Sequence, residues 1–378
     1  MNTIEQIHAS PLRVVIATAG AGQGLLTNLL GVSGASNTLL EAVIPYSQRA
    51  FDDFLGNAPK QYVSDEAARL LAGCAYRRAR ELSQDVFPVA GLACTAALAT
   101  NREKKGEHRG YMALWMQNRL ITQRVVLTKG SRERGEEEAI YSQIMLNLLA
   151  EGGEVSERVE LPLIADETVE TTVYNFADMA QRLHSGDLEY FAVHDHGKIR
   201  TTDVRPQTLL SGSFNPLHDG HLGMARAASQ ILERPVAFEI SAFNVDKPPI
   251  SPEVVLRRIS QFAGRHPIYV SNAPTYVKKS RLYPGATFII GFDTAVRLFA
   301  PKYYHDSESE MTQALDEVAE RSCSFLVAGR RDGEHFRTLA DVDVPERFKS
   351  LFQPIPETKF RLDISSTQLR ASGKAESR

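Results

Sequence analysis

Two histidines in the C-terminal half carry the strongest chemical signal in the sequence. His218 and His221 follow Gly212 in the stretch GSFNPLHDGH, between a strand-like run at 207–210 and a helical run at 222–228. A strand, a glycine turn and a helix start lay backbone N–H groups and the positive end of a helix around a phosphate. Because residues three apart share one face of a helical turn, both imidazoles can reach one anion.

A second polar stretch lies near the C-terminus. The sequence DISSTQLR at 363–370 is typical of a helix start. The hydroxyls of Ser365, Ser366 and Thr367 can cap that helix or bind phosphate oxygens, and Arg370 adds a planar, permanently charged fork. Each stretch alone also has a structural interpretation, one as an ordinary turn with two hydrogen-bonded histidines and the other as a capped helix.

Together the two stretches resemble the HxGH-type nucleotidylyltransferase superfamily, whose signatures are G-x-F-x-P-x-H-x-G-H and I-S-S-T-x-x-R. The resemblance implies transfer of a nucleotidyl group from a nucleoside triphosphate to a phosphorylated acceptor, with release of pyrophosphate. It implies Mg²⁺ with the triphosphate, although no protein ligand for the metal is evident. The catalytic residues that it implies are His218, His221, Lys247 and Arg370. The nucleotide-binding residues that it implies are Gly212, Ser213, Phe214, Gly291, Asp293, Arg330, Ser365, Ser366 and Thr367.

Four positions between the two signatures have alternative interpretations. Lys247 would neutralise charge between phosphates, or it is a solvated loop lysine. Gly291 and Asp293 resemble the G-x-D element of nicotinamide-mononucleotide adenylyltransferases, but Asp293 could instead be a helix N-cap. Arg330 packs near the nucleotide or lies on the surface. The loop 301–310 covers the acceptor side or is a solvated connection.

Strand-like and helical segments alternate throughout the region that carries these residues, 206–378. Strand-like runs occur at 235–241, 268–271, 286–290 and 324–330, with helical runs between them. This alternation favours right-handed βαβ units and a Rossmann-like, doubly wound parallel sheet. Ligands of such sheets bind at the carboxyl ends of the strands, near the point where the strand order reverses. The predicted site residues follow strand or helix ends, as this geometry requires.

Length and composition set the context for these motifs. A chain of 378 residues is long enough for two domains, and its 43% hydrophobic and 24% charged residues are typical of globular proteins. The net charge of -3 argues against nucleic acid or an anionic membrane as the main partner. Three widely spaced cysteines without a Cys-x-x-Cys indicate a reducing compartment. Without a signal-peptide pattern or long apolar run, we expect a cytoplasmic protein.

The first 152 residues form a predicted α/β domain of their own. A strand-like run at 12–17 leads into a glycine loop at 18–24 and a helical run at 25–30. Such a loop can cradle a phosphate, although its pattern alone is a weak signal. Further helical runs lie at 64–84 and 133–151, and further strand-like runs at 86–90, 110–115 and 120–127.

Residues 10–152 resemble the C-terminal domain of the CinA-like family, the nicotinamide-nucleotide amidases. The segments that carry the resemblance are the glycine loop, VSGAS at 32–36, PYS at 45–47, VAGLA at 89–93 and GYMALW at 110–115. In active members a serine of the glycine loop is the nucleophile. Alignment without a gap from Gly34 puts Ala19 at that serine and Ala21 at the following threonine. The lysine expected after the Y-S-N element falls on Phe51.

An amidase needs an attacking hydroxyl and a group that takes its proton, which alanine and phenylalanine do not supply. Tyr46 and Ser47 are retained, which favours a preserved pocket. Thr18 lies next to the nucleophile position and would need a shift of the loop to replace the missing hydroxyl. We therefore expect a degenerate amidase site at Ala19, Ala21, Tyr46 and Phe51. The domain would then serve structure, homo-oligomer formation or ligand sensing.

Residues 153–205 are the predicted connector to the nucleotidylyltransferase domain. Its strand-like and helical runs lie at 158–164, 176–183 and 190–197. The run His194-Asp195-His196 invites a metal-site interpretation. On a strand, however, Asp195 would point away from both histidines, and no further ligand is close in sequence. We predict no metal site and a strand that ends in a glycine turn.

The acceptor is inferred from the presence of the two predicted domains in one chain. An amidase-like fold from nicotinamide-nucleotide metabolism favours nicotinamide or nicotinate mononucleotide as the acceptor and ATP as the donor. Fold alone does not fix function, so a cytidylyltransferase with another acceptor and a non-catalytic nucleotide-binding sensor remain alternatives. The retained histidines, hydroxyls and Arg370 argue against the sensor.

Overall fold

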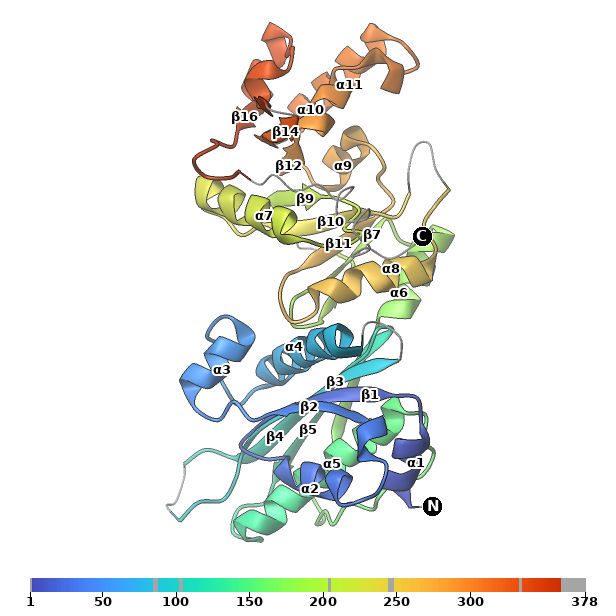
Figure 1. The fold of residues 1–378 in the computed structure, drawn as a ribbon, viewed down its shortest axis with the longest axis vertical. Helices are drawn as coiled ribbons and strands as arrows, with labels where there is room; N and C mark the ends of the chain where they lie inside the picture. The colour runs from blue at the N-terminus through green and yellow to red at the C-terminus, as the bar shows by residue number, and fades with distance from the viewer. Residues whose placement is uncertain are drawn as a thin grey trace. The chain divides into compact units, whose positions relative to one another are not determined.

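The computed structural model describes residues 2–83, 88–101, 105–202, 205–243, 248–332 and 335–361. The chain divides into two compact units, which both combine helices with a sheet (Figure 1). The N-terminal unit comprises Met1–Asp178, Val193–Ile199 and Ile259–His266. The C-terminal unit comprises Met179–Ala192, Arg200–Arg258 and Pro267–Arg378. The predicted α/β class is thus confirmed for both halves.

The N-terminal unit is built on a six-stranded sheet in the order β2-β1-β3-β4-β5-β6. Its strands are β1 (Arg13–Ala19), β2 (Leu39–Val43), β3 (Val89–Ala97), β4 (His108–Trp115), β5 (Arg119–Leu127) and β6 (Glu170–Asn175). β1 pairs in parallel with β2 and β3, and the pairs from β3 to β6 are antiparallel. Its helices are α1 (Thr3–Ala9), α2 (Gln23–Leu30), α3 (Gln48–Leu55), α4 (Asp65–Ser83) and α5 (Arg134–Gly152), with the 3₁₀ turn η1 (Ala35–Asn37).

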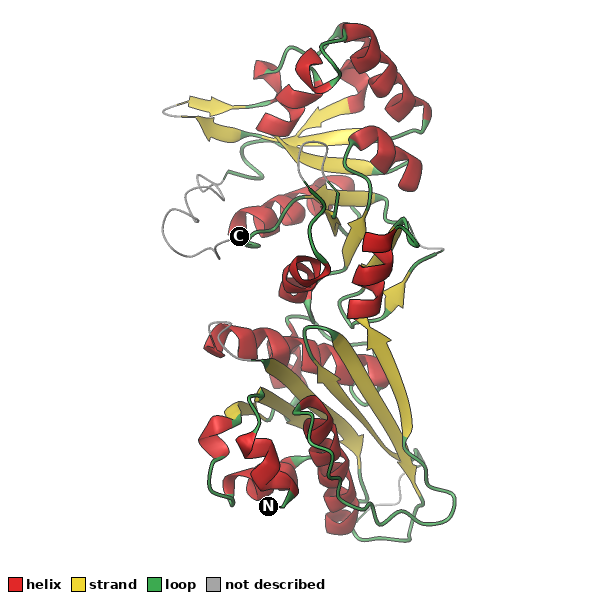
Figure 2. Cartoon of the chain, turned by 90° about the vertical axis from the view of Figure 1, so that its right-hand side faces the viewer, coloured by secondary structure: helices red, strands yellow, loops and turns green. Residues whose placement is uncertain are grey.

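Helices cover both faces of this sheet (Figure 2). On one face, Leu25 of α2 and Ile144 of α5 pack with Ile16 and Leu92 in one apolar core. On the other face, α4 lies directly on β3. There, a Cβ atom on Gly91 would come within 2.1 Å of the Ala72 carbonyl oxygen, so the helix backbone touches the strand backbone. The strand needs glycine at this position because no side chain fits.

The segment after α5 differs from the sequence prediction. The strand predicted at 158–164 is wrong, because these residues form no regular structure. They are held by tertiary bonds instead, in which the Asn147 side chain binds both the N–H and the carbonyl of Val159 and Arg132 donates to the Pro162 carbonyl. The Glu167 side chain, 1% exposed, forms an ion pair with Arg132 at 2.7 Å and accepts the N–H of Thr128 at 2.7 Å and of Ile164 at 3.1 Å. β6 is not predicted from the sequence, because it is a largely exposed edge strand without an apolar face.

We expect stability to fall in acid because of Glu167. Burial by itself raises the pKa of this carboxyl, but the bonds from Arg132, Thr128 and Ile164 lower it to about 2, from 4.5. A pKa difference of this size corresponds to about 3 kcal/mol of unfolding free energy, present above pH 4.5 and lost as the pH falls toward 2. Thermal unfolding between pH 2 and 6 checks this. Glu167→Gln should flatten the profile. Glu170→Gln, which removes an exposed partner of Arg124, should leave it unchanged.

The C-terminal unit is built on an eight-stranded sheet in the order β16-β13-β12-β9-β10-β11-β7-β8. Its strands are β7 (Tyr190–Val193), β8 (Ile199–Arg200), β9 (Thr208–Ser211), β10 (Ala237–Ser241), β11 (Ile268–Ser271), β12 (Thr287–Gly291), β13 (Ser324–Ala328) and β16 (Phe352–Pro354). β14 (Arg330–Asp332) and β15 (His335–Arg337) form a separate hairpin. The pairs of β9 with β10 and β12, and those outward to β11, β13 and β16, are all parallel. The strand order reverses between β9 and β12.

The connections between these strands are largely helical. The helices between them are α7 (Asp219–Leu232), α8 (Pro252–Ile259), α9 (Tyr276–Leu282), α10 (Phe292–Leu298) and α11 (Glu308–Glu320), and α6 (Phe176–Ser185) precedes β7. The 3₁₀ turns are η3 (Pro301–Tyr303), η4 (Leu339–Asp341) and η5 (Glu346–Leu351), and η2 (Ser260–Phe262) lies in the segment that belongs to the N-terminal unit. On one sheet face, Leu209, Phe288 and Phe325 pack with Leu282 of α9 and Leu315 of α11. Within the described ranges, no helix is long and apolar enough to span a lipid bilayer.

Candidate functional site

The carboxyl ends of the central strands meet at one edge of the C-terminal sheet. Leu210 of β9 lies opposite Phe238 of β10 and Ile289 of β12, so the three strands end together. Gly212 follows β9, and its N–H donates to the Glu239 carbonyl at 2.9 Å. This edge includes the reversal of strand order, which is where doubly wound sheets bind ligands.

The loop after β9 builds a support for one of the two histidines. Phe214 has a positive φ of 44°, and its side chain is fully buried. Its ring meets His221 edge-on at 4.9 Å and Phe238 at 5.4 Å. A Cβ on Gly212 would lie 2.8 Å from the Phe214 ring, so the glycine is required by this packing. Because the Phe214 side chain is buried, only its backbone could contact a nucleotide. Ser213 is exposed.

His218 and His221 cap the start of α7 and stack on each other. The Nδ1 atom of His218 accepts the N–H of Gly220 at 3.1 Å, and the Nδ1 of His221 accepts the N–H of His218 at 3.3 Å. The ring centroids are 3.8 Å apart with an interplanar angle of 29°. A neutral imidazole that accepts at Nδ1 carries its proton on Nε2. Each ring is therefore an N–H donor at Nε2.

The two imidazoles are neutral at physiological pH. Burial, with a smaller effect of the neighbouring His218, lowers the pKa of His221 to about 3. Burial also lowers the pKa of His218, against an opposing effect of Asp219. The pair thus offers two oriented N–H donors, and the N-terminus of α7 adds its partial positive charge. This combination suits a phosphate group.

The ends of β12 and β13 bring Asp293 and Arg330 together. Gly291 is the N-cap of α10, so the interpretation of Asp293 as the N-cap is wrong; it lies in the first turn. Its carboxylate forms an ion pair with the Arg330 guanidinium at the start of β14, and both side chains are 49% exposed. A Cβ on Gly291 would meet no atom within 4 Å, so there is open space beside it. The charged pair therefore lies beside open space at the carboxyl edge.

Five predicted site residues lie outside the described residues. They are Lys247, Ser365, Ser366, Thr367 and Arg370. Phe360 lies shortly before the second signature. Its ring packs on α7, 3.0 Å from where a Cβ atom of Gly223 would be. Gly223 is two residues after His221.

A second candidate site, in the N-terminal unit, gathers most of the predicted degenerate amidase positions. Ala19, Tyr46 and Phe51 line a pocket of about 290 Å³, together with Ser47, Tyr62 and Thr95. Ala21 is fully buried and is not among the lining residues. Phe51 is 3% exposed and meets Tyr62 edge-on at 5.3 Å. An aromatic ring thus stands where the resemblance predicts a lysine.

Thr18 does not supply a hydroxyl to this pocket. Alternate residues of a strand face opposite sides, so Thr18 shares the face of Val14 and Ile16, away from Ala19. Its methyl carbon lies 3.1 Å from where a Cβ of Gly22 would be, on the side of α2. The loop shift considered from the sequence would therefore have to move a buried side chain across the sheet.

The hydroxyls that do line the pocket are engaged in structural bonds. Thr95 donates to the Tyr62 carbonyl at 2.7 Å, and Ser47 caps α3 by accepting the Ala50 N–H at 3.2 Å. Tyr62 donates to the Asp52 carboxylate at 3.0 Å. Its desolvation, the hydrogen bond and the Asp52 charge all raise the pKa of Tyr62. This raised pKa makes the phenol a weak nucleophile near neutral pH.

The glycine loop of the N-terminal unit, predicted as a phosphate cradle, holds a carboxylate of the protein itself. One oxygen of Glu138, from α5, accepts the N–H groups of Gly22 and Gly24, both at 3.0 Å. The Ser142 hydroxyl donates to the same oxygen at 2.7 Å and accepts the Leu25 N–H at 3.2 Å. The donors that would meet a phosphate are thus used to bind α2 to α5.

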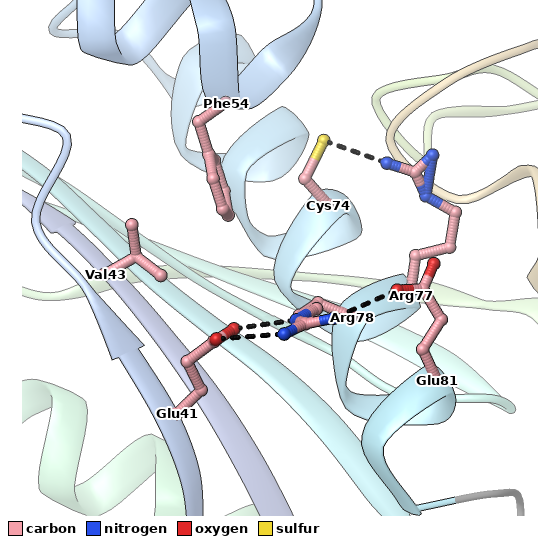
Figure 3. Close-up of a pocket in the computed structure, with 7 residues that line it drawn as sticks. All are labelled: Glu41, Val43, Phe54, Cys74, Arg77, Arg78 and Glu81. Carbon is pink, nitrogen blue, oxygen red and sulfur yellow. Dashed lines mark hydrogen bonds and ion pairs between the residues drawn. The ribbon is translucent and has the colours of Figure 1, made fainter.

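A further pocket of about 340 Å³ lies beside α4 (Figure 3). Arg78 binds the Glu41 carboxylate through two nitrogens, at 2.9 and 3.2 Å. Arg77 lies 3.6 Å from the sulfur of Cys74. Burial raises the pKa of this thiol, more than the arginine lowers it. Cys74 is therefore a buried thiol and not an activated nucleophile.

The His194-Asp195-His196 run lies in a turn. β7 ends at Val193, so the predicted strand stops before His194, and Gly197 closes the turn that follows with φ 77°. Asp195 does not point away from both histidines, because its carboxylate pairs with His196 at 2.8 Å. Across the described ranges no three His, Cys, Asp or Glu side chains form a group that could hold a metal ion.

Comparison with known proteins relates the two halves to different groups. Residues 209–372 match the cytidylyltransferase-like family. A "Putative nicotinamide mononucleotide adenylyltransferase" of Schizosaccharomyces pombe is 27% identical over 187 residues, covering 44% of this chain and 70% of the relative. A "Probable nicotinate-nucleotide adenylyltransferase" of Gloeobacter violaceus is 31% identical over 197 residues, covering 44% of this chain and 84% of the relative.

Solved structures are similar over 40% of the chain, in its N-terminal part. The competence/damage inducible protein CihA from Agrobacterium tumefaciens is 18% identical, with a TM-score of 0.33 and 96% of that chain covered. A competence-damaged protein (CinA) superfamily protein from Enterobacter cloacae is 16% identical, with a TM-score of 0.33 and 90% of that chain covered.

The parallel sheet, its reversal of strand order and the histidine pair at a helix start define a doubly wound α/β domain in the C-terminal half, with a candidate phosphate site at the carboxyl edge. With these features and the sequence matches together, the chain belongs to the nucleotidylyltransferase family.

Proposed function

We propose that the C-terminal unit transfers an adenylyl group from ATP to nicotinamide or nicotinate mononucleotide. In this reaction a phosphate oxygen of the acceptor forms a bond to the α-phosphorus of ATP. The bond from that phosphorus to the bridging oxygen breaks, and pyrophosphate leaves. The observation that carries the proposal is the stacked pair of neutral imidazoles at the start of α7.

The chain's own residues contribute orientation and charge stabilisation. The Nε2–H groups of His218 and His221 would donate to phosphate oxygens that gain negative charge as the leaving bond breaks. Their backbone-bound Nδ1 atoms hold both rings in the donor tautomer before substrate arrives, so little reorganisation is needed. The Asp293–Arg330 pair would contact the nucleoside. Lys247, Ser365, Ser366, Thr367 and Arg370 keep the phosphate roles that the resemblance implies.

The names of two relatives support the choice of substrates. One is named for nicotinamide mononucleotide and the other for nicotinate nucleotide, and both are named adenylyltransferases. Mg²⁺ would accompany the triphosphate. Asp293 is already paired with Arg330, and no group of three potential metal ligands occurs among the described residues, so we assign the ion no protein ligand and derive no step through it.

We propose further that the N-terminal unit does not hydrolyse amides. Its pocket presents Ala19 and Phe51 where a nucleophile and a lysine are expected, and Thr18 faces the other side of the sheet. The retained pocket would then bind a ligand without turning it over.

One experiment tests both proposals. Purified protein with Mg²⁺ is given ATP or CTP, each with nicotinamide mononucleotide, nicotinate mononucleotide or phosphocholine. Pyrophosphate and the dinucleotide product are measured, and ammonia release from nicotinamide mononucleotide is followed in the same mixtures. We expect pyrophosphate only with ATP and a pyridine mononucleotide, and no ammonia.

Other outcomes point elsewhere. Turnover with CTP alone would make the protein a cytidylyltransferase, and triphosphate binding without turnover of any pair would favour a nucleotide sensor. Ammonia release would overturn the proposal for the N-terminal unit.

A further inference from the structure

A buried ion pair lies beneath the carboxyl edge of the C-terminal sheet. The Lys279 ammonium, on α9, contacts the Glu239 carboxylate, on β10, at 2.5 Å. Glu239 is fully buried and Lys279 is 4% exposed. Ser271, at the end of β11 and also fully buried, donates its hydroxyl to the other carboxylate oxygen at 2.6 Å. Both oxygens of the carboxylate are thus occupied by protein donors.

The backbone of the same glutamate binds the start of the loop 212–218, which leads from β9 to the two histidines and is called the histidine loop below. The Glu239 carbonyl accepts the N–H of Gly212, the first residue after β9, at 2.9 Å. Glu239 also lies directly opposite Ser211, the last residue of β9. The position of Glu239 across the sheet therefore sets where the loop to His218 begins.

Further bonds connect this pair to the ends of the neighbouring strands. The Ser271 hydroxyl accepts the Ala273 N–H at 3.2 Å, and the Ser241 hydroxyl donates to the Ala273 carbonyl at 2.9 Å. On the other side, the Tyr276 ring of α9 packs on Phe288 of β12 and Phe325 of β13, each at 5.3 Å. α9 thus contacts strands on both sides of β9. Its Tyr276 packs on β12 and β13, and its Lys279 pairs with Glu239 of β10.

Stability does not explain why the pair is present. Removing two charges from water is costly, and replacement of a buried ion pair by apolar groups of similar shape is often neutral or stabilising. The surrounding core is apolar and aromatic, including Leu209, Tyr190, Tyr269 and Tyr283. A well-packed apolar pair would suit that core. In some proteins, buried polar groups of this kind instead select one arrangement among several similar ones.

We propose that Glu239 and Lys279 are positioning residues for nucleotidyl transfer. They act through the Gly212 hydrogen bond, which keeps the histidine loop and the start of α7 in register with β10 and β12. The inference rests on the proposed function for its effect on turnover. Its effect on the loop itself can be measured without turnover.

The test is the double variant E239Q/K279M, which removes both charges but keeps similar side-chain shapes. Its matched control is R281M/E317Q, which removes a surface ion pair with two hydrogen bonds between Arg281 of α9 and Glu317 of α11. Turnover, melting temperature and amide hydrogen exchange of the segment 211–221 are measured for both variants and the unaltered chain. If E239Q/K279M does not fold, S271A provides the same readouts without leaving an unpaired charge.

We expect E239Q/K279M to keep its melting temperature and to lose exchange protection at 211–221. Its kcat should fall about 10- to 100-fold while the KM for ATP stays within about threefold, since misplacement affects the transition state more than binding. R281M/E317Q should match the unaltered chain in every readout. Unchanged exchange protection together with unchanged kcat would overturn the inference. An unaltered chain without turnover would contradict the proposed function, and the exchange result would then decide the inference alone.

Discussion

His221→Ala should reduce turnover about 10²- to 10³-fold, the usual effect of removing one preorganised donor to a developing negative charge. The loss should appear in kcat, because the Nε2–H is aimed before substrate binds and acts most strongly on the transition state. Steady-state kinetics with ATP and a pyridine mononucleotide measure it. Because the pKa of His221 is lowered to about 3, the unaltered chain should show no activity step near pH 6.5 from this group.

The fold should survive His221→Ala. The change removes the acceptor for the His218 N–H, and loss of a helix cap typically costs about 1 kcal/mol. His184→Ala, which alters an exposed histidine of α6, is the matched control and should leave kcat unchanged. Normal kcat in His221→Ala, with a normal melting temperature, would contradict the proposed phosphate site.

Gly91→Ala should destabilise the N-terminal unit by about 3 kcal/mol or more, at the upper end of overpacking effects. The added carbon would lie 2.1 Å from the Ala72 carbonyl oxygen and 2.2 Å from the Tyr76 nitrogen, and both are backbone atoms. A flexible side chain could move aside, but here α4 itself must shift from the sheet. Chemical denaturation, with the midpoint and slope fitted together, measures the effect.

Gly135→Ala is the control for this substitution. Gly135 lies in the first turn of α5, where an added Cβ would meet no atom within 4 Å. Alanine should therefore be neutral or stabilise the helix by about 0.5–1 kcal/mol. A Gly91→Ala variant as stable as Gly135→Ala would show that α4 does not rest on β3 as described.

Helices and strands with a regular apolar pattern could be predicted from the sequence, because burial of one face imposes that pattern. The strand at 268–271 has the same bounds in the structure, and the long helix predicted at 64–84 is α4 at Asp65–Ser83. β6 could not be predicted, because an exposed edge strand needs no apolar alternation. The opposite holds at 158–164, where alternating apolar residues indicate a strand but bonds from the distant Asn147 and Arg132 hold an irregular segment.

The site residues, too, could be predicted only where they are close together in the sequence. The histidine signature was visible because its residues are close in sequence. The pairing of Asp293 with Arg330 depends on adjacency of β12 and β13, which spacing does not reveal. Glu138, which binds the glycine loop, is more than a hundred residues away from it in the sequence. The composition of the loop therefore indicates a phosphate site without revealing that a carboxylate of the protein occupies it. Glycine patterns indicate a close approach without saying which group approaches.

The segment predicted as a connector, 153–205, contributes β6 to one sheet and β7 and β8 to the other. A recombinant fragment that starts at 206 would therefore leave the edge of β11 without its neighbour, and one that ends at 152 would do the same to β5. Unpaired strand edges are templates for aggregation. Attempts to express either half alone from these boundaries should yield insoluble protein for this reason, even where each half retains all its motif residues.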